Sequence, residues 1–201
     1  DAHYKLARVY DQRQEMAKAF AEYDRTADLD PANVDALVQA SRLLVLAGAF
    51  DDARERAERA VRQDGSSVAA RIALGNALAG LHESGRALRE MEQALALDPR
   101  YAPAHAAIGA VQLLRGATEA ARASFEKAIA LDPGSVDARL ALANLHWAAD
   151  DLDATERELK QALAASPGNA LGHRALALFY LTGGRVAEAE PHFRALAAQS
   201  V

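Results

Sequence analysis

Apolar positions recur along the whole chain at a fixed period of 34 residues, while β-branched residues are scattered without the alternation that marks a strand. The smallest position of the period is occupied by Ala7, Ser41, Gly75, Gly109, Ala143 and Ala177. A position that is mostly large, sixteen residues further on, is occupied by Tyr23, Ala57, Met91, Phe125, Leu159 and Phe193. Alanine, the best helix former, supplies about a quarter of the residues. We therefore predict an all-α fold.

Turn residues follow the same period. The tripeptide Leu-Asp-Pro ends at Pro31, Pro99 and Pro133, Pro167 follows Ser166, and Gly65 takes the missing place. Because proline cannot continue a helix interior, each of these turns ends one helix pair and begins the next. The chain then forms one array of six units, approximately residues 1–33, 34–67, 68–101, 102–135, 136–169 and 170–201.

These rows resemble the tetratricopeptide repeat: a large residue before a small one, then an aromatic, an alanine, a second aromatic and a proline. The resemblance covers essentially the whole chain and implies a right-handed α-solenoid of antiparallel helix pairs, with the first helices lining the concave side. One pair is expected at 136–149 and 152–165, and the last helix at about 185–198. The chain departs from the pattern at Gln112 and His146, where an aromatic is usual, and at Pro191, which should bend the last helix.

In each first helix, the stripe opposite the core residues is expected to face the groove. This stripe is basic in the first units and mostly apolar further on, and an exposed apolar groove with a polar rim marks an interaction site. The candidate partner-binding residues are Arg8, Val38, Arg42, Ile72, Asn76, Leu113, Leu140, Asn144, Trp147, Leu178 and Leu181. We expect an apolar or amphipathic segment, with its acidic end near the first two units. The alternative is that packing between units buries much of this stripe.

Trp147 is the single tryptophan and the first choice for a binding hot spot, because tryptophan is enriched among such residues. The alternative is that Trp147 packs against the first helix of the next unit. Arg8, Arg42 and Asn76 only loosely resemble the clamp with which some family members hold a peptide carboxylate, since the lysines are missing. The asparagine ladder of another subtype is absent from its row; a small ladder from Asn76 and Asn144 stays open.

Composition narrows the function further. The formal net charge of −5 and the pI of about 5.7 argue against nucleic-acid binding. Cysteine is absent, and no apolar stretch is long enough to span a membrane. His3, His105 and His173 share one row two units apart, too far to share a metal, and His146 with His105 or His173 is a conceivable pair. We expect no metal, cofactor or catalytic residue.

The sequence thus predicts a non-catalytic protein that binds a partner peptide or segment in its groove. One alternative is a scaffold that self-associates through its ends, because no capping helix follows the last pair and solenoids need polar caps. Another is a regulatory part of a larger enzyme, and the uncapped end also fits a fragment of a longer protein. The composition suits the cytoplasm and the periplasm equally, and the partner's identity cannot be read.

Overall fold

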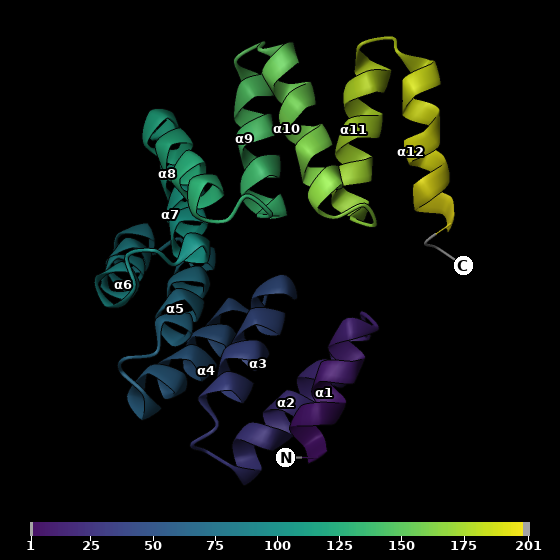
Figure 1. Cartoon of the computed structure of the whole chain (residues 1–201). Coiled ribbons are helices and arrows are strands. Elements are labelled where there is room, and N and C mark those ends of the chain that lie inside the picture. Colours follow the sequence, from purple (N-terminus) through teal and green to yellow (C-terminus); the bar gives the residue numbers. More distant parts are fainter. Residues whose placement is uncertain (1, 199–201) are drawn as a thin grey trace. The chain divides into compact units, whose positions relative to one another are not determined.

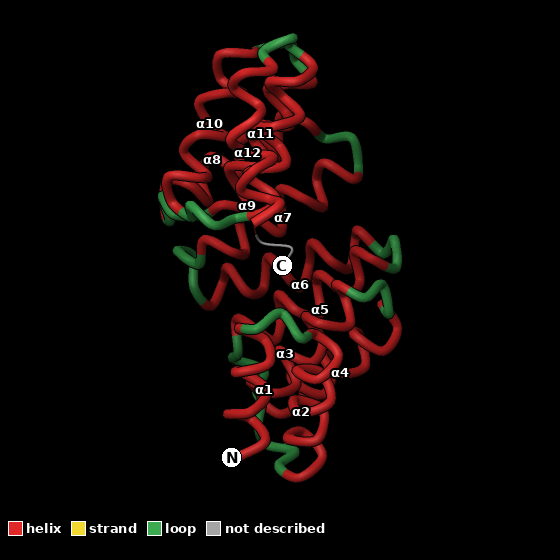
Figure 2. Tube along the Cα trace, turned by 90° about the vertical axis from the view of Figure 1, so that its right-hand side faces the viewer, coloured by secondary structure: helices red, strands yellow, loops and turns green. Residues whose placement is uncertain are grey.

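The computed structural model describes residues 2–198, and all regular structure within them is helical (Figures 1 and 2). The helices are α1 (Ala2–Gln12), α2 (Met16–Leu29), α3 (Val34–Leu46), α4 (Phe50–Gln63), α5 (Val68–Gly80), α6 (Ser84–Leu97), α7 (Ala102–Leu114), α8 (Thr118–Leu131), α9 (Val136–Ala148), α10 (Leu152–Ala165), α11 (Ala170–Thr182) and α12 (Val186–Ala198). This confirms the all-α prediction. Each successive pair of helices lies within one of the six predicted units.

The two helices of every pair are joined by a three-residue turn whose second residue has a positive φ angle. Glycine occupies this position in three pairs, at Gly48, Gly116 and Gly184, and it adopts such angles without a Cβ clash. The other three pairs use Gln14 (φ 59°), His82 (φ 63°) and Asp150 (φ 60°). The turn geometry therefore repeats every 34 residues even where the sequence gives no glycine signal.

The chain divides into two compact units, residues 1–100 and 101–201, of three helix pairs each. Within each unit, helices contact their neighbours in the chain, and first helices of successive pairs also meet: α3 with α5, α7 with α9 and α9 with α11. In the second unit, one core gathers around Phe125 and Leu142, and another around Leu159 and Leu176. Stacking of successive pairs thus buries the apolar face that one pair alone leaves in water.

Close contact within each pair depends on the row of small residues. A Cβ placed on Gly109 would lie 2.7 Å from a ring carbon of Phe125, and one on Gly75 would lie 2.8 Å from Met91. Both distances are shorter than van der Waals contact allows. The small residue of one helix therefore makes the room that the large residue of its partner fills, as the sequence pattern indicates.

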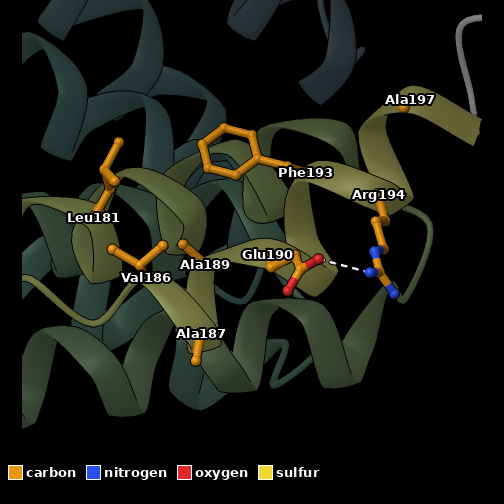
Figure 3. Close-up of a pocket in the computed structure, with 8 residues that line it drawn as sticks. All are labelled: Leu181, Val186, Ala187, Ala189, Glu190, Phe193, Arg194 and Ala197. Atoms are coloured by element: carbon orange, nitrogen blue, oxygen red, sulfur yellow. Dashed lines mark hydrogen bonds and ion pairs between the residues drawn. The ribbon is translucent and has the colours of Figure 1, made fainter.

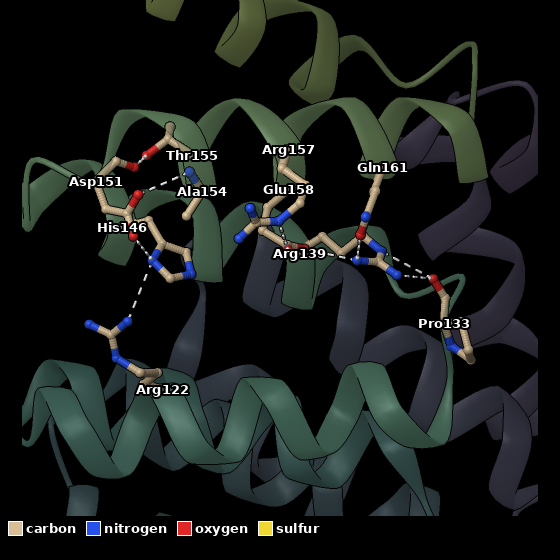
Figure 4. A network of polar contacts seen from close by, with 10 residues as sticks. All are labelled: Arg122, Pro133, Arg139, His146, Asp151, Ala154, Thr155, Arg157, Glu158 and Gln161. Atoms are coloured by element: carbon tan, nitrogen blue, oxygen red, sulfur yellow. Dashed lines mark hydrogen bonds and ion pairs between the residues drawn. The ribbon is translucent and has the colours of Figure 1, made fainter.

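In the third and fifth pairs, a polar clasp ties the two helices together at the end away from their connecting turn. In Figure 4, Arg139 of α9 donates hydrogen bonds to the carbonyl oxygen of Pro133 at 3.1 and 3.0 Å and pairs with Glu158 of α10 at 2.8 Å. Gln161 also accepts from Arg139. The same pattern recurs in the third pair, where Arg71 pairs with Glu90 at 3.0 Å. Pro191 lies inside α12, and the helix continues past it to Ala198; the bend expected there stays a prediction.

Candidate functional site

The face formed by the first helices of the second unit, α7, α9 and α11, carries exposed apolar side chains. We call it the first-helix face of this unit. Leu113 is 39% exposed, Leu178 50% and Leu181 47%, and the polar Asn144 lies exposed between them in the repeat pattern. Leu113 and Leu181 share one repeat position with Trp147, so an apolar row crosses three successive first helices. Apolar side chains that gather on an exposed face mark a candidate site for a partner, because covering them removes apolar area from water.

One row of the predicted stripe packs between helix pairs and offers little open surface. Ile72 is only 8% exposed, whereas Val38 and Leu140 are half-buried and pack against the cores of their own units. The physical reason is that first helices of successive pairs contact each other, so this row faces a neighbouring helix. Ile72 is therefore left out of the surface proposed below.

In the first unit, the expected basic character is weaker than the residue types suggest. Arg42 donates to Asp11 at 2.5 Å and to Gln39 at 2.8 Å, so its charge is neutralised by a carboxylate 31 residues earlier in the sequence. Arg8 is exposed beside Asp11, and Asn76 of α5 is also exposed. A small pocket of about 230 Å³ is lined by Tyr4, Arg8, Asp11, Gln12, Tyr23 and Gln39. It offers polar contacts but no concentrated positive charge.

Trp147, near the end of α9, is half-buried against the first helix of the next pair. Its ring meets that of Phe179 in α11 edge to face, with centroids 5.5 Å apart and planes at 80°. The remaining surface of Trp147 borders a pocket of about 390 Å³ between the fifth and sixth helix pairs. The pocket is lined by Trp147, Leu152, Asp153, Glu156, Phe179, Thr182, Gly183 and Arg185. Trp147 thus packs against the first helix of the next pair, as the alternative interpretation of the sequence predicts, and still keeps an accessible side.

Glu156 of α10 organises the charges beside this pocket. It accepts hydrogen bonds from Arg185 at 2.5 Å, from Lys160 at 2.6 Å and from the Tyr180 hydroxyl at 3.0 Å. The hydrogen bonds from Arg185 and Lys160 lower the pKa of Glu156 to about 2, because they stabilise the ionised carboxylate. Arg185 pairs with Glu188 as well, and its guanidinium lies 4.5 Å from the centroid of the Tyr180 ring. Both charges of this pair are therefore already satisfied within the protein.

The histidines do not gather as metal ligands. His146 lies 3.5 Å from Arg122 and 3.7 Å from Asp151 (Figure 4), while His173 contacts His192 at 3.0 Å. Within residues 2–198 no three histidine or acidic side chains are placed to hold a metal ion. The contact between His173 and His192 is one that sequence spacing did not suggest.

A larger hollow, of about 730 Å³, opens on the outer face of α12 (Figure 3). Its lining includes Leu181, Val186 and Phe193, with an ion pair between Glu190 and Arg194 at 2.6 Å. Leu181 therefore contributes to this hollow as well as to the first-helix face. Phe193 is 46% exposed, although its equivalents in the other repeats are buried, so this hollow is a face that a further helix could cover.

Helix pairs that recur at a constant period and stack on their neighbours define the class of α-helical repeat proteins. Within the described residues, no helix is both long enough and apolar enough to cross a membrane. Sequence profiles described as tetratricopeptide repeat match residues 72–136 and 140–200, and a further one matches residues 112–161. The chain belongs to the tetratricopeptide repeat family, whose repeats generally mediate protein–protein interaction.

Solved structures show the same fold. A thermophilic TPR protein of Thermus thermophilus, TTC0263, is 24% identical with a TM-score of 0.82, covering 90% of this chain and 98% of its own. The pilF protein of Pseudomonas aeruginosa is 18% identical with a TM-score of 0.67 (96% and 87% covered). YrrB, described as a TPR protein with an unusual peptide-binding site, is 22% identical with a TM-score of 0.52 (86% and 89% covered). A comparison with curated proteins found no significant match to the chain.

Proposed function

We propose that the chain is a non-catalytic interaction module and that the first-helix face of residues 101–201 binds an apolar or amphipathic segment of a partner protein. The observation that carries the proposal is the apolar row Leu113, Trp147 and Leu181, which crosses α7, α9 and α11. The leucines of this row are exposed and the tryptophan keeps one open side. Covering such side chains removes apolar area from water, which is the main driving force of association.

Polar neighbours would set the register of the bound segment. Asn144 is exposed on α9, at the repeat position that Leu178 occupies on α11, and can both donate to and accept from a backbone amide. A single hydrogen bond of this kind contributes about 1 kcal/mol, whereas truncation of a buried aromatic hot spot costs about 2 kcal/mol or more. The apolar row therefore supplies most of the affinity. Binding of a peptide by the similar YrrB agrees with this use of the fold.

The test is an immobilised library of amphipathic and polar peptides, probed with the native chain and three variants. Trp147→Ala and Leu113→Glu should each lower the affinity for the best-binding peptides by about tenfold or more, since each removes part of the apolar row. Asn76→Ala, an exposed change in the first unit, is the matched control and should bind like the native chain. Far-UV circular dichroism checks that the variants fold. Equal binding by all four proteins would contradict the proposal.

A second candidate function, self-association, has its own supporting observation. Leu6 and Val9 of α1 are 40% and 41% exposed, and Phe193 of α12 is 46% exposed. The equivalents of all three residues are buried in the other five repeats. Inside a unit, the equivalent of Phe193 in one pair packs against the equivalents of Leu6 and Val9 in the next pair. We therefore infer that α1 of one copy fits against α12 of a second copy in a head-to-tail contact, which is open-ended unless it closes a ring.

Two variants separate this contact from ordinary aggregation. Val9→Glu blocks one face and Phe193→Glu blocks the other, so each variant alone should be monomeric by light scattering. Mixed together they should form a one-to-one dimer, because each still holds one intact face. A native chain that keeps its monomer mass at high concentration would rule out self-association.

A further inference from the structure

The pocket beside Trp147 has a composition that the apolar first-helix face does not explain. Trp147, Leu152 and Phe179 form its apolar part, and Leu152 is 49% exposed although it is a large aliphatic residue. The charged residues that line it are Asp153, Glu156 and Arg185. At about 390 Å³ it lies in the lower part of the range of about 300–1,000 Å³ that small-molecule pockets occupy.

Two of the three charges are committed to partners within the protein. Glu156 accepts from Arg185, Lys160 and Tyr180, and Arg185 is also held by Glu188 and by the ring of Tyr180. Asp153 is different: it is exposed in the first turn of α10, and within residues 2–198 its side chain has no hydrogen bond or ion pair. The lining therefore carries one uncompensated negative charge.

We propose that this pocket receives a basic side chain, arginine or lysine, of the partner segment that the first-helix face binds. The aliphatic stem would lie on Trp147 and Leu152, and the cation would reach the Asp153 carboxylate near the face of the indole ring. This inference rests on the proposed function, since it names one side chain of the same partner.

The alternatives to a basic side chain fit the pocket less well. An acidic group would meet the net negative charge, because Arg185 has no free donor pair to turn toward it. A purely apolar group would cover Asp153 and strip water from a carboxylate without replacing it, which is unfavourable. Arginine and lysine combine a long apolar stem with a charged head, and a cation over a tryptophan gains a further attraction.

Trp147 is the only tryptophan, so its fluorescence reports directly on this pocket. The probes are a short capped apolar peptide that contains one arginine and the same peptide with citrulline, which has the same shape without the charge. The native chain should show a saturable fluorescence change with the arginine peptide and bind the citrulline peptide about fivefold more weakly. Free argininamide should bind more weakly still, because a partner segment also covers the first-helix face.

The variant Asp153→Asn should bind both peptides alike, at the level of the native chain with citrulline. The matched control is Asp137→Asn, which removes an exposed first-turn carboxylate from α9 outside the pocket and should leave the difference in affinity between the two peptides intact. Equal affinity of the native chain for the two peptides, or an unchanged preference in Asp153→Asn, would overturn the pocket assignment alone. If the native chain bound no peptide of the library, the proposed function itself would instead be overturned.

Discussion

At the scale of single residues, the small positions of the repeat set how closely the helices approach. Ser41 uses this closeness for a buried hydrogen bond of 2.9 Å to the carbonyl oxygen of Ala53, while Gly75 and Gly109 leave room for Met91 and Phe125. Glycine inside a helix costs about 1 kcal/mol relative to alanine. Its presence at these two places is explained by packing and not by helix propensity.

The variant Gly109→Ala should therefore lower the free energy of unfolding by about 1 kcal/mol, because overpacking of about 1–3 kcal/mol exceeds the gain in helix propensity. The control Gly85→Ala places its Cβ no nearer than 3.9 Å to a flexible arginine and should raise stability by about 0.5 kcal/mol. Urea denaturation of both variants measures the difference. A stabilised Gly109→Ala protein would show that Phe125 can move aside.

At the scale of elements, the last helix pair replaces the clasp of the third and fifth pairs with two histidines. His173 contacts the Pro167 carbonyl oxygen at 2.8 Å, where Arg139 contacts Pro133, and His192 stands where Glu158 does. Burial, and to a lesser degree the neighbouring His173, lower the pKa of His192, since both disfavour its charged form. A contact between two imidazole rings thus stands in the last pair where the third and fifth pairs have an ion pair.

The folded protein thus keeps His192 neutral at a pH where the unfolded chain, with a pKa of about 6.5, is protonated. Protonation of His192 therefore leaves the free energy of unfolding unchanged above about pH 6.5 and lowers it as the pH falls further. The groups that face it are His173 and Tyr180 of α11, with Glu188 one turn earlier on α12 already held by Arg185.

Amide hydrogen exchange, corrected for intrinsic rates, should accordingly show weaker protection of α12 at about pH 5.5 than at about pH 7.5, with α8 unchanged. His192→Gln should remove this pH dependence. His82→Asn, in an exposed turn with a positive φ angle, should retain it. Equal loss of protection in α8 and α12 would point to general acid destabilisation and against the histidine pair.

At the scale of the whole molecule, stability comes from contacts between helices that are neighbours in the chain. Each of the two compact units contains three helix pairs, about the smallest number of repeats that forms a stable stack. In such proteins the free energy is approximately a sum of repeat and neighbour contributions. Each unit should therefore hold enough of its own core to fold.

The fragment 101–201 should accordingly be helical by far-UV circular dichroism and should melt cooperatively, at a lower temperature than the full chain. The fragment 1–100, cut at the same boundary, is its counterpart. A fragment that stays unfolded on its own would mean that the two units depend on each other for stability. The prediction of one continuous array would then gain support over two separable units.

Much of the fold could be predicted because it depends on residue type and spacing. Proline and glycine turns gave helices at 136–149 and 152–165, and the structure has Val136–Ala148 and Leu152–Ala165. The positive φ angles at Gln14, His82 and Asp150 could not be predicted from the sequence, because none of these turn positions is a glycine. The candidate surface was predicted only in part, since helical periodicity shows which way a residue faces but not what lies opposite.

By itself, then, the sequence determined the repeat, the helix pairs, the small and large partners in each pair and the rows that face away from them. These features follow from local geometry and a constant period. Only the tertiary structure decided that Ile72 is covered, that Asp11 neutralises Arg42, and that Trp147 and Asp153 line one pocket. Accessibility and charge pairing depend on side chains from different helices, and stacking alone brings those side chains together.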